Sequence, residues 1–525
     1  MGFHCVNCGG SMVFDVSLQQ MRCEHCDSTL DPAMFDFRDR GIAVDRHYTD
    51  MTSFTCQNCG AELVSTDDSM VGFCPYCGGQ SLVTQSAGQH EVERIIPFKV
   101  SKEQCSELYR TFARKIRYLP KEFKDPSYLQ KFTGIYMPYY LFDARFGETS
   151  IDGEKTVERN RRYDVVNTYH YSADITGPYR WGAPCDASKY LDDEISDRVL
   201  PYDTAKDMPF NPAYLAGFYA DASTVRPDVY YEDAASLAEE NMVGAITEDI
   251  MARDGVTVKP GASVETEVTA SHSTLFPMWF LTWRKDDRVA YAVVNGESGK
   301  VVSDLPLDLR AFAIGSVVIS VALFLLLEAF VQPTPLVTSI ISLVAALLMT
   351  LGVRRGAKRV FEVQTHANDK GWSGETSDPE ARKKRRKGKT KKFGLSDLVT
   401  IALVLVVGYF YIGSFLDDNS LSLGLILKMI LPIIVLCFVA STLFKTISWR
   451  KVTKDAQGVI ASIVLLLSTL LNAAIVAISP VNDGWYYIGD AICIIGLVVA
   501  AVCMLRVYNL GTTRPLPKLF DREEV

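Results

Sequence analysis

Eight of the thirteen cysteines of this 525-residue chain stand in C-x-x-C pairs within its first 77 residues. They form two sets, Cys5, Cys8, Cys23 and Cys26, then Cys56, Cys59, Cys74 and Cys77. In each set fourteen residues separate the two pairs, and the second set repeats the first at an offset of 51 residues. Tetrahedral Zn²⁺ takes four thiolates at about 2.3 Å, and a C-x-x-C turn can direct two of them at one ion. The spacing predicts two structural zinc ions held by all eight cysteines, with no coordination position left for catalytic water.

Other cysteine chemistry fits this pattern less well. Disulfides are rare in a reducing cytosol, and a redox C-x-x-C usually occurs singly. Iron–sulfur binding stays open, although the even repeat suits two separate sites. The histidines next to ligands, His4 and His25, are expected to be exposed and are not needed as ligands. Glycine follows three of the pairs and permits a tight turn, whereas Asp27 follows the fourth.

Each cysteine set predicts two knuckles joined by a hairpin, which is a small β zinc ribbon. The ribbons are expected at 1–30 and 54–85, with a linker at 31–53. Residues 1–90 hold no Lys, four Arg and eleven Asp or Glu. Nucleic-acid affinity rests on Lys and Arg that neutralise phosphates, so we expect these ribbons to contact proteins instead.

Residues 91–308 predict a cytosolic α+β domain. Ser101 and Gln104 make a capping box that should begin a helix over 101–117, and a second amphipathic helix is expected over 232–253. Alternating or β-branched runs predict strands at 136–146, 163–175, 277–283, 289–294 and 300–302. Its two well-separated histidines, His170 and His272, lie in no catalytic motif, and we expect no enzyme activity.

The last 215 residues predict a membrane domain, because a span needs about 20 apolar residues. Six runs qualify, at 311–331, 336–353, 395–416, 423–444, 459–478 and 486–507. The loop at 354–392 has 14 Lys or Arg against 5 Asp or Glu, and basic and non-basic loops alternate thereafter. By the positive-inside rule both termini and the tail at 508–525 should face the cytosol of a multi-pass cell-membrane protein. No secretory signal opens the sequence.

Polar groups in the predicted spans are few. Glu328, Lys428 and Asp490 lie near span ends, where snorkelling to the interface explains them, and Asn472 is a further polar residue. A transport pathway is therefore the less favoured alternative. The run at 382–392 has nine bases in eleven residues and should hold its loop inside and attract anionic lipid. Nucleic-acid binding and partner docking stay open for it.

Four stretches outside the cysteine sets resemble a bacterial membrane protein family with TFIIB-type zinc ribbons, an α+β domain and transmembrane helices. They are IIPF at 95–98, GIYMPYYLFD at 134–143, LAGFY at 215–219 and YAVVNGESGKVVSDLP at 291–306. Some similar proteins are associated with phage-shock-type envelope stress systems. The resemblance therefore implies PspA-like coat proteins among the partners.

Together these features predict a multidomain chain of two small β zinc ribbons, an α+β cytosolic domain and an all-α, six-helix transmembrane domain. The expected function is a membrane-embedded scaffold that recruits cytosolic or membrane proteins to the lipid bilayer, in an envelope stress response. A membrane-tethered nucleic-acid-binding protein is the alternative, and a transporter is less favoured.

Overall fold

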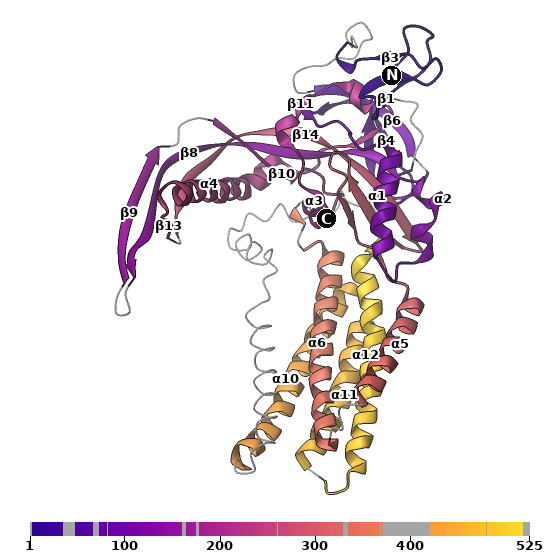
Figure 1. The fold of residues 1–525 in the computed structure, drawn as a ribbon. Coiled ribbons are helices and arrows are strands. Elements are labelled where there is room, and N and C mark those ends of the chain that lie inside the picture. The colour runs from indigo at the N-terminus through magenta and orange to yellow at the C-terminus, as the bar shows by residue number, and fades with distance from the viewer. Residues whose placement is uncertain are drawn as a thin grey trace.

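In the computed structural model of the chain, a β-rich head stands on one end of a group of long helices (Figure 1). The head comprises residues 3–308 and the helical region residues 309–517. The structure describes residues 3–34, 48–66, 73–80, 82–159, 164–174, 178–259, 261–328, 334–367, 369–370, 421–478 and 480–517.

The first cysteine set lies in a small three-stranded antiparallel sheet. Its strands are β1 (Met12–Asp15), β2 (Gln20–Cys23) and β3 (Thr29–Leu30), and the 3₁₀ turn η1 (Pro32–Met34) follows. Alternate side chains such as Met12 and Phe14 are buried, as a half-buried strand requires. They pack into the core of the rest of the head, and Phe14 stacks edge-on against Tyr214 with ring centroids 5.0 Å apart.

A fourteen-stranded mixed sheet forms most of the head, and its strand β17 comes from the end of the helical region. Its strands are β4 (Tyr48–Cys56), β5 (Glu62–Ser65), β6 (Leu82–Glu91), β7 (Arg94–Ile95), β8 (Thr133–Arg159), β9 (Asp164–Asp174), β10 (Pro178–Asp186), β11 (Met208–Pro209), β12 (Tyr219–Asp221), β13 (Thr257–Val258), β14 (Ser263–Lys285), β15 (Arg288–Asn295), β16 (Val301–Ser303) and β17 (Arg514–Pro515). The central path runs β11-β7-β14-β8-β12-β5-β4-β6, and the other strands pair with β8, β14 or β15.

The second cysteine region belongs to this same sheet. β4 and β5 pair with each other, β6 pairs with β4, and β5 pairs with β12 of the middle region. The predicted boundaries at 54–85 therefore cut through β4 and β6, and the predicted linker at 31–53 contains η1 and the first six of the nine residues of β4. Sequence spacing locates the cysteine turns but carries no signal for pairing with a strand more than 150 residues away.

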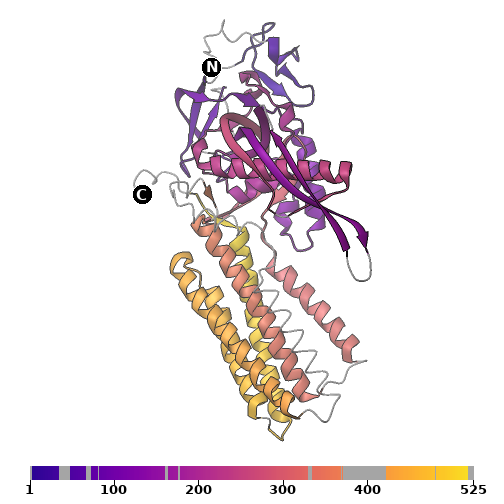
Figure 2. The same cartoon turned by 90° about the vertical axis from the view of Figure 1, so that its left-hand side faces the viewer.

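An arm made of the long strands β8, β9 and β14 projects sideways from the head (Figures 1 and 2). Helix α4 (Tyr231–Asp254) lies along it and ends at Gly255, whose φ of 63° suits a left-handed cap. Gly153 of β8 leaves room for Val256, because a Cβ at Gly153 would lie 2.3 Å from the Val256 Cγ1. The predicted strands at 136–146 and 163–175 fall within β8 and, to one residue at each end, β9.

The remaining helices of the head are short. They are α1 (Lys102–Lys115), α2 (Pro126–Leu129), α3 (Asp193–Val199), and the 3₁₀ turns η3 (Lys121–Lys124), η4 (Thr204–Lys206), η5 (Pro212–Leu215) and η6 (Pro227–Tyr230). Ser101 and Gln104 form the predicted capping box. Along α1, Cys105, Tyr109 and Ala113 are buried, whereas Leu108 is 40% exposed.

Aromatic side chains fill the core on both faces of the central strands. On one face Phe98 lies 4.9 Å from Tyr136, 4.6 Å from Phe218 and 5.0 Å from Trp279, measured between ring centroids. On the other face Tyr139 stacks on Phe276. Aromatic pairs of this kind add to the stabilisation from area burial. The central strands are therefore covered on both sides.

The helical region contains α5 (Leu309–Glu328), α6 (Pro335–Thr365), α10 (Leu421–Thr453), α11 (Gln457–Ile478) and α12 (Gly484–Thr512). Within the described residues, three helical segments have the length and apolar composition to cross a membrane: Val337–Thr365, Gln457–Val476 and Gly484–Thr512. The predicted span at 395–416 and the basic run at 382–392 lie outside the described residues.

A charged network joins the head to the helical region. Arg514, which follows α12, contacts Asp304 at 3.2 Å and Asp192 at 3.1 Å. Arg198 of α3 contacts the same Asp304 at 2.6 Å, and Arg359 of α6 pairs with Glu194. The strand β17 also pairs with β15 of the large sheet. The two regions are therefore linked by a sheet pairing as well as by ion pairs.

Candidate metal centres

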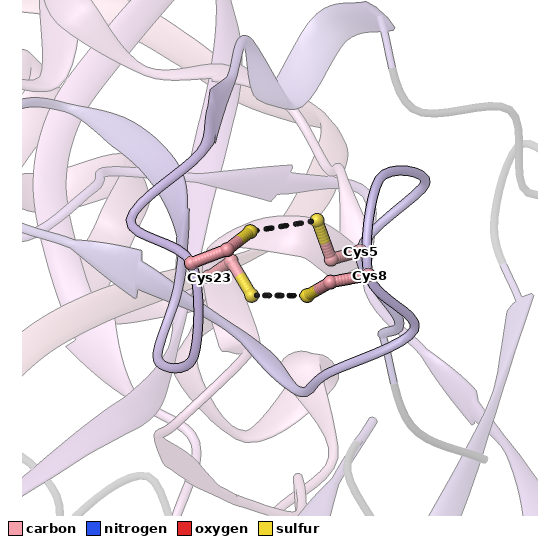
Figure 3. A group of neighbouring side chains, drawn as sticks. Cys5, Cys8 and Cys23 are labelled. Atoms are coloured by element: carbon pink, nitrogen blue, oxygen red, sulfur yellow. Dashed lines mark hydrogen bonds between the residues drawn. The ribbon is translucent and has the colours of Figure 1, made fainter.

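The first cysteine set converges from two turns at the free end of the head. Cys5 and Cys8 lie on one loop and Cys23 faces them from the other, as the dashed contacts of Figure 3 show. The Cys8 and Cys23 Sγ atoms are 3.5 Å apart, and those of Cys5 and Cys26 are 3.6 Å apart. Cys5 and Cys23 are buried, while Cys8 and Cys26 are exposed. One side of this site is therefore open to solvent.

Backbone geometry directs these sulfurs inward. In the first turn the Asn7 and Gly10 amides donate to the Cys5 and Cys8 Sγ atoms at 3.4 Å. The Gly9 amide closes the turn on the Cys5 carbonyl at 2.8 Å, with φ of 73° at Gly9. Such N–H···S contacts favour the thiolate form that a metal requires.

Asp27 occupies the left-handed position that glycine fills in the other three turns. Its φ is 57°, and its amide donates to the Cys23 carbonyl at 3.1 Å as the glycine amides do in their turns. Asp is among the residues that tolerate this conformation. Its carboxylate also pairs with Arg22 at 2.6 Å. Asp27 in place of glycine therefore preserves the turn.

The second cysteine set is enclosed. Cys56, Cys59, Cys74 and Cys77 are all fully buried. The Cys56 and Cys77 Sγ atoms are 3.6 Å apart and those of Cys59 and Cys74 are 3.7 Å apart. The Asn58 side chain and the Gly79 amide each donate to the Cys77 Sγ at 3.4 Å. This site is inside the head, not on its surface.

Tyr76, between the last two cysteines, ties this site to the sheet. Its hydroxyl donates to the Asp221 carboxylate of β12 at 2.5 Å, and its carbonyl accepts from the Tyr291 hydroxyl at 2.7 Å. Burial raises the pKa of Asp221 to about 6, although hydrogen bonds from Ser188 and Tyr76 lower it. A cavity of about 420 Å³ lies beside Asp221. Because that carboxylate already accepts from Tyr76 and Ser188, we assign it a structural role.

Both sets are compatible with one metal ion each. In each set the four Sγ atoms all lie within 4.8 Å of one another. A tetrahedral ion with bonds of about 2.3 Å would place its sulfurs about 3.8 Å apart. The observed contacts of 3.5 to 3.7 Å come close to that spacing. A shell of four sulfurs leaves no open position, so the arrangement suits a structural ion.

The histidines lie apart from both sites. His4 and His25 are exposed beside the first set. His170 on the arm pairs with Asp152 at 2.6 Å. His272 lies between two carboxylates, 2.7 Å from Glu93 and 3.0 Å from Asp143. Residue spacing does not predict this last group, because the pairing of β7 and β8 with β14 brings its members together over long sequence separations.

The pKa of His272 responds to opposing effects. Burial lowers its pKa, but hydrogen bonds from its ring to Asp143 and Glu93 raise it, and the net shift is upward. The two carboxylates favour the charged imidazolium. The arrangement is an ion-pair cluster of one histidine and two carboxylates.

The snorkelling prediction was wrong for Asp490. This residue is 7% exposed and lies in the second turn of α12. Its carboxylate contacts Thr338 and Ser342 of α6 and Asn472 of α11. Sequence hydropathy places a charge along a helix but does not show which neighbours enclose it. Glu328 and Lys428 lie in helices whose side chains are not described at those positions.

Comparison with known proteins gives a distant relative. The chain is 25% identical over 236 residues to the uncharacterized protein YdjG of Bacillus subtilis (strain 168). The match covers 44% of this chain and 68% of YdjG. No family model matches the chain, and no solved structure matches it. The chain is therefore a distant homologue of a protein without a stated activity, with two four-cysteine clusters that agree with zinc ribbons.

Proposed function

We propose that the chain is a membrane-embedded scaffold whose zinc-bearing head holds partner proteins at the cytosolic surface of the membrane. One observation carries the proposal: the two cysteine regions differ in burial. The second is enclosed in the large sheet, whereas the first presents half of its site at the end of the head away from the helices. A buried centre can stabilise a fold, but only the exposed one can also contact a partner.

The surface of the first cysteine region supports a protein partner. Val6 and Met34 are each 75% exposed there, and Leu18 is 52% exposed. Exposed large apolar side chains such as these are available for contact with a protein partner. We name residues 3–34 the docking region.

Charge in the docking region opposes nucleic acid as the partner. It contains a single base, Arg22, and four acids, Asp15, Glu24, Asp27 and Asp31. Metal-bound thiolates would add negative charge. Such a surface repels phosphate. A protein of the PspA-like coat type is the partner that the family resemblance implies.

Recruitment can be tested on membranes that contain the full chain. Val6→Asp should abolish binding of a purified PspA-like coat protein to vesicles carrying this protein, because it places a charge in an apolar contact. Val165→Asp is the matched control, since Val165 is also exposed but lies on β9 of the arm. Equal binding by wild type and Val6→Asp, or no binding to either, would reject the proposed recruitment.

We further propose six membrane spans with both termini in the cytosol. Helices α6, α10 and α12 run toward the head at their C-terminal ends (Figure 1). Bases in the C-terminal parts of these helices support this topology: Arg354 and Arg359 on α6, Lys451 on α10 and Arg506 on α12. Asp483 and Trp485 lie at the opposite end of α12. Reporter fusions after 420 and 483 should report the outer side, and fusions after 370 and 454 the cytosol. Any reversal contradicts the topology.

The assignment of zinc to the two cysteine sets is tested separately. Elemental analysis of the purified full chain should return close to two zinc ions, and Cys8→Ser or Cys74→Ser should each remove one. Iron in place of zinc would contradict the assignment.

A further inference from the structure

A cluster of hydrogen-bonding side chains lies inside the helical region, near its end away from the head. Asp490 of α12 is its one acid, and Thr338, Ser342 and Asn472 surround it from α6 and α11. Asn472 is fully buried, and Thr338 lies at the start of α6. A carboxylate enclosed between apolar helices is costly and needs a specific reason.

The contacts divide between the two carboxylate oxygens. Asp490 Oδ1 accepts from the Ser342 hydroxyl at 3.1 Å and from the Asn472 amide at 3.3 Å. Asp490 Oδ2 lies 2.5 Å from the Thr338 Oγ1. That hydroxyl has one proton, and it also lies 2.7 Å from the Pro335 carbonyl. When the Thr338 hydroxyl donates its proton to the Pro335 carbonyl, no hydrogen lies between its oxygen and Asp490 Oδ2. The close contact of these two oxygens is then favourable only if a cation binds the carboxylate or the carboxylate is protonated.

A second observation also indicates a cation beside Asp490. The Asn472 Oδ1 is buried and has no hydrogen-bond partner, although the amide nitrogen of the same side chain contacts Asp490. A buried carbonyl oxygen without a hydrogen-bond donor destabilises a folded protein. Such an oxygen can instead coordinate a cation. The cluster thus combines one negative charge with hydroxyl and amide oxygens, the donors that hard cations prefer.

The charge count selects a monovalent ion. Asp490 supplies one negative charge, and the helices whose side chains contact it (α6 over 335–353, α11 over 457–478 and α12 over 484–505) contain no other Asp, Glu, Lys, Arg or His. Helix α10 packs against α6 and α11 and carries Lys428, in a stretch whose side chains are not described. The Cys493 thiol is a further titratable group beside the cluster, and it contacts the Ser342 carbonyl at 3.8 Å. A divalent ion would leave an uncompensated charge in a medium of low dielectric constant.

We propose that Thr338, Ser342, Asn472 and Asp490 form a binding site for one monovalent cation, Na⁺ or a proton. The site does not depend on zinc or on partner recruitment. It adds a ligand-binding role to helices that would otherwise serve only as an anchor.

Thermal unfolding of the purified full chain in detergent tests the site. Sodium chloride is exchanged for choline chloride at constant ionic strength, at several pH values. If Na⁺ binds, the unfolding temperature rises by on the order of 2 °C for each tenfold increase in sodium above its dissociation constant. If a proton binds instead, the unfolding temperature follows a single titration without sodium dependence. Asp490→Asn should abolish either response.

The matched control is Asp483→Asn, an exposed acid two turns before Asp490 on the same segment. It should keep the wild-type response. Should Asp490→Asn fail to fold, Thr338→Val and equilibrium binding of radioactive sodium to the wild type replace it. A protonated carboxyl would then be sought by infrared difference spectroscopy. A wild type that binds no sodium and shows no titrating carboxyl, or responses retained in Asp490→Asn, would overturn the proposal.

Discussion

At the scale of single residues, the pKa of His272 depends on the two carboxylates that the fold brings beside it. Its ring contacts Glu93 and Asp143, which raise its pKa above the ordinary value despite burial. A raised folded-state pKa contributes stability below the unfolded pKa of about 6.5. That contribution is lost as the pH rises through the folded-state pKa. His272→Gln should therefore lose stability relative to wild type at pH 6, and the difference should shrink by pH 8, measured by thermal unfolding.

His170→Gln is the control for this prediction. His170 is exposed on the arm and its contact with Asp152 is screened by water. Its replacement should leave the stability at both pH values almost unchanged. A His272→Gln difference that stays constant between pH 6 and pH 8 would show that the ion pairs with Glu93 and Asp143 are not the cause.

At the scale of elements, the two cysteine regions should respond differently to the loss of one thiolate. Cys74→Ser affects a buried site whose strands β4 and β5 belong to the central sheet. Cys8→Ser affects a three-stranded sheet at the margin. Limited proteolysis should therefore degrade the whole head in Cys74→Ser but release only the docking region in Cys8→Ser. Equal digestion patterns would contradict this.

The hydrogen bond from Tyr76 to Asp221 joins the second cysteine region to β12. Tyr76→Phe leaves a buried carboxylate with one fewer donor, which should lower the free energy of unfolding by about 1–3 kcal/mol. Tyr291→Phe provides the comparison, because its hydroxyl donates to a neutral carbonyl and should cost about 0.5–1.5 kcal/mol. Chemical denaturation of the two variants measures both values, and the reverse order would refute the assignment.

At the scale of the whole molecule, Asp304 holds the head and the helical region together. Burial alone would raise its pKa, but Arg514, Arg198 and Arg359 hold that pKa below its usual value. A lowered folded-state pKa contributes stability above the unfolded pKa of about 3.9. That contribution is lost as the pH falls through the folded-state value.

Asp304→Asn should lower the free energy of unfolding at pH 7 by about 3 kcal/mol, since it leaves the buried Arg514 with less compensation. The loss should begin to diminish as the pH is lowered below 4, because the unfolded chain then takes up a proton at Asp304, and it should vanish once the pH passes below the lowered folded-state pKa. Arg226→Gln, which breaks an exposed pair with Asp228, should cost less than about 1 kcal/mol. Denaturant titration at pH 7 and pH 3.5 compares the variants.

The sequence by itself determined the features that depend on neighbouring residues. Paired cysteines at fixed spacing identify two four-sulfur groups, and the structure brings both together. The capping box of Ser101 and Gln104 locates the start of α1, because a cap involves atoms only three residues apart. Long apolar runs locate α6, α11 and α12 for the same reason, since hydropathy is a sum over adjacent residues.

Only the tertiary structure decided which distant groups meet. The pairing of β5 with β12 merges the second cysteine region into the head. The approach of α6 and α11 to α12 encloses Asp490, and β7, β8 and β14 gather the carboxylates around His272. These contacts form between segments far apart in the chain. Their free energies depend on burial and partner geometry, which residue spacing does not encode.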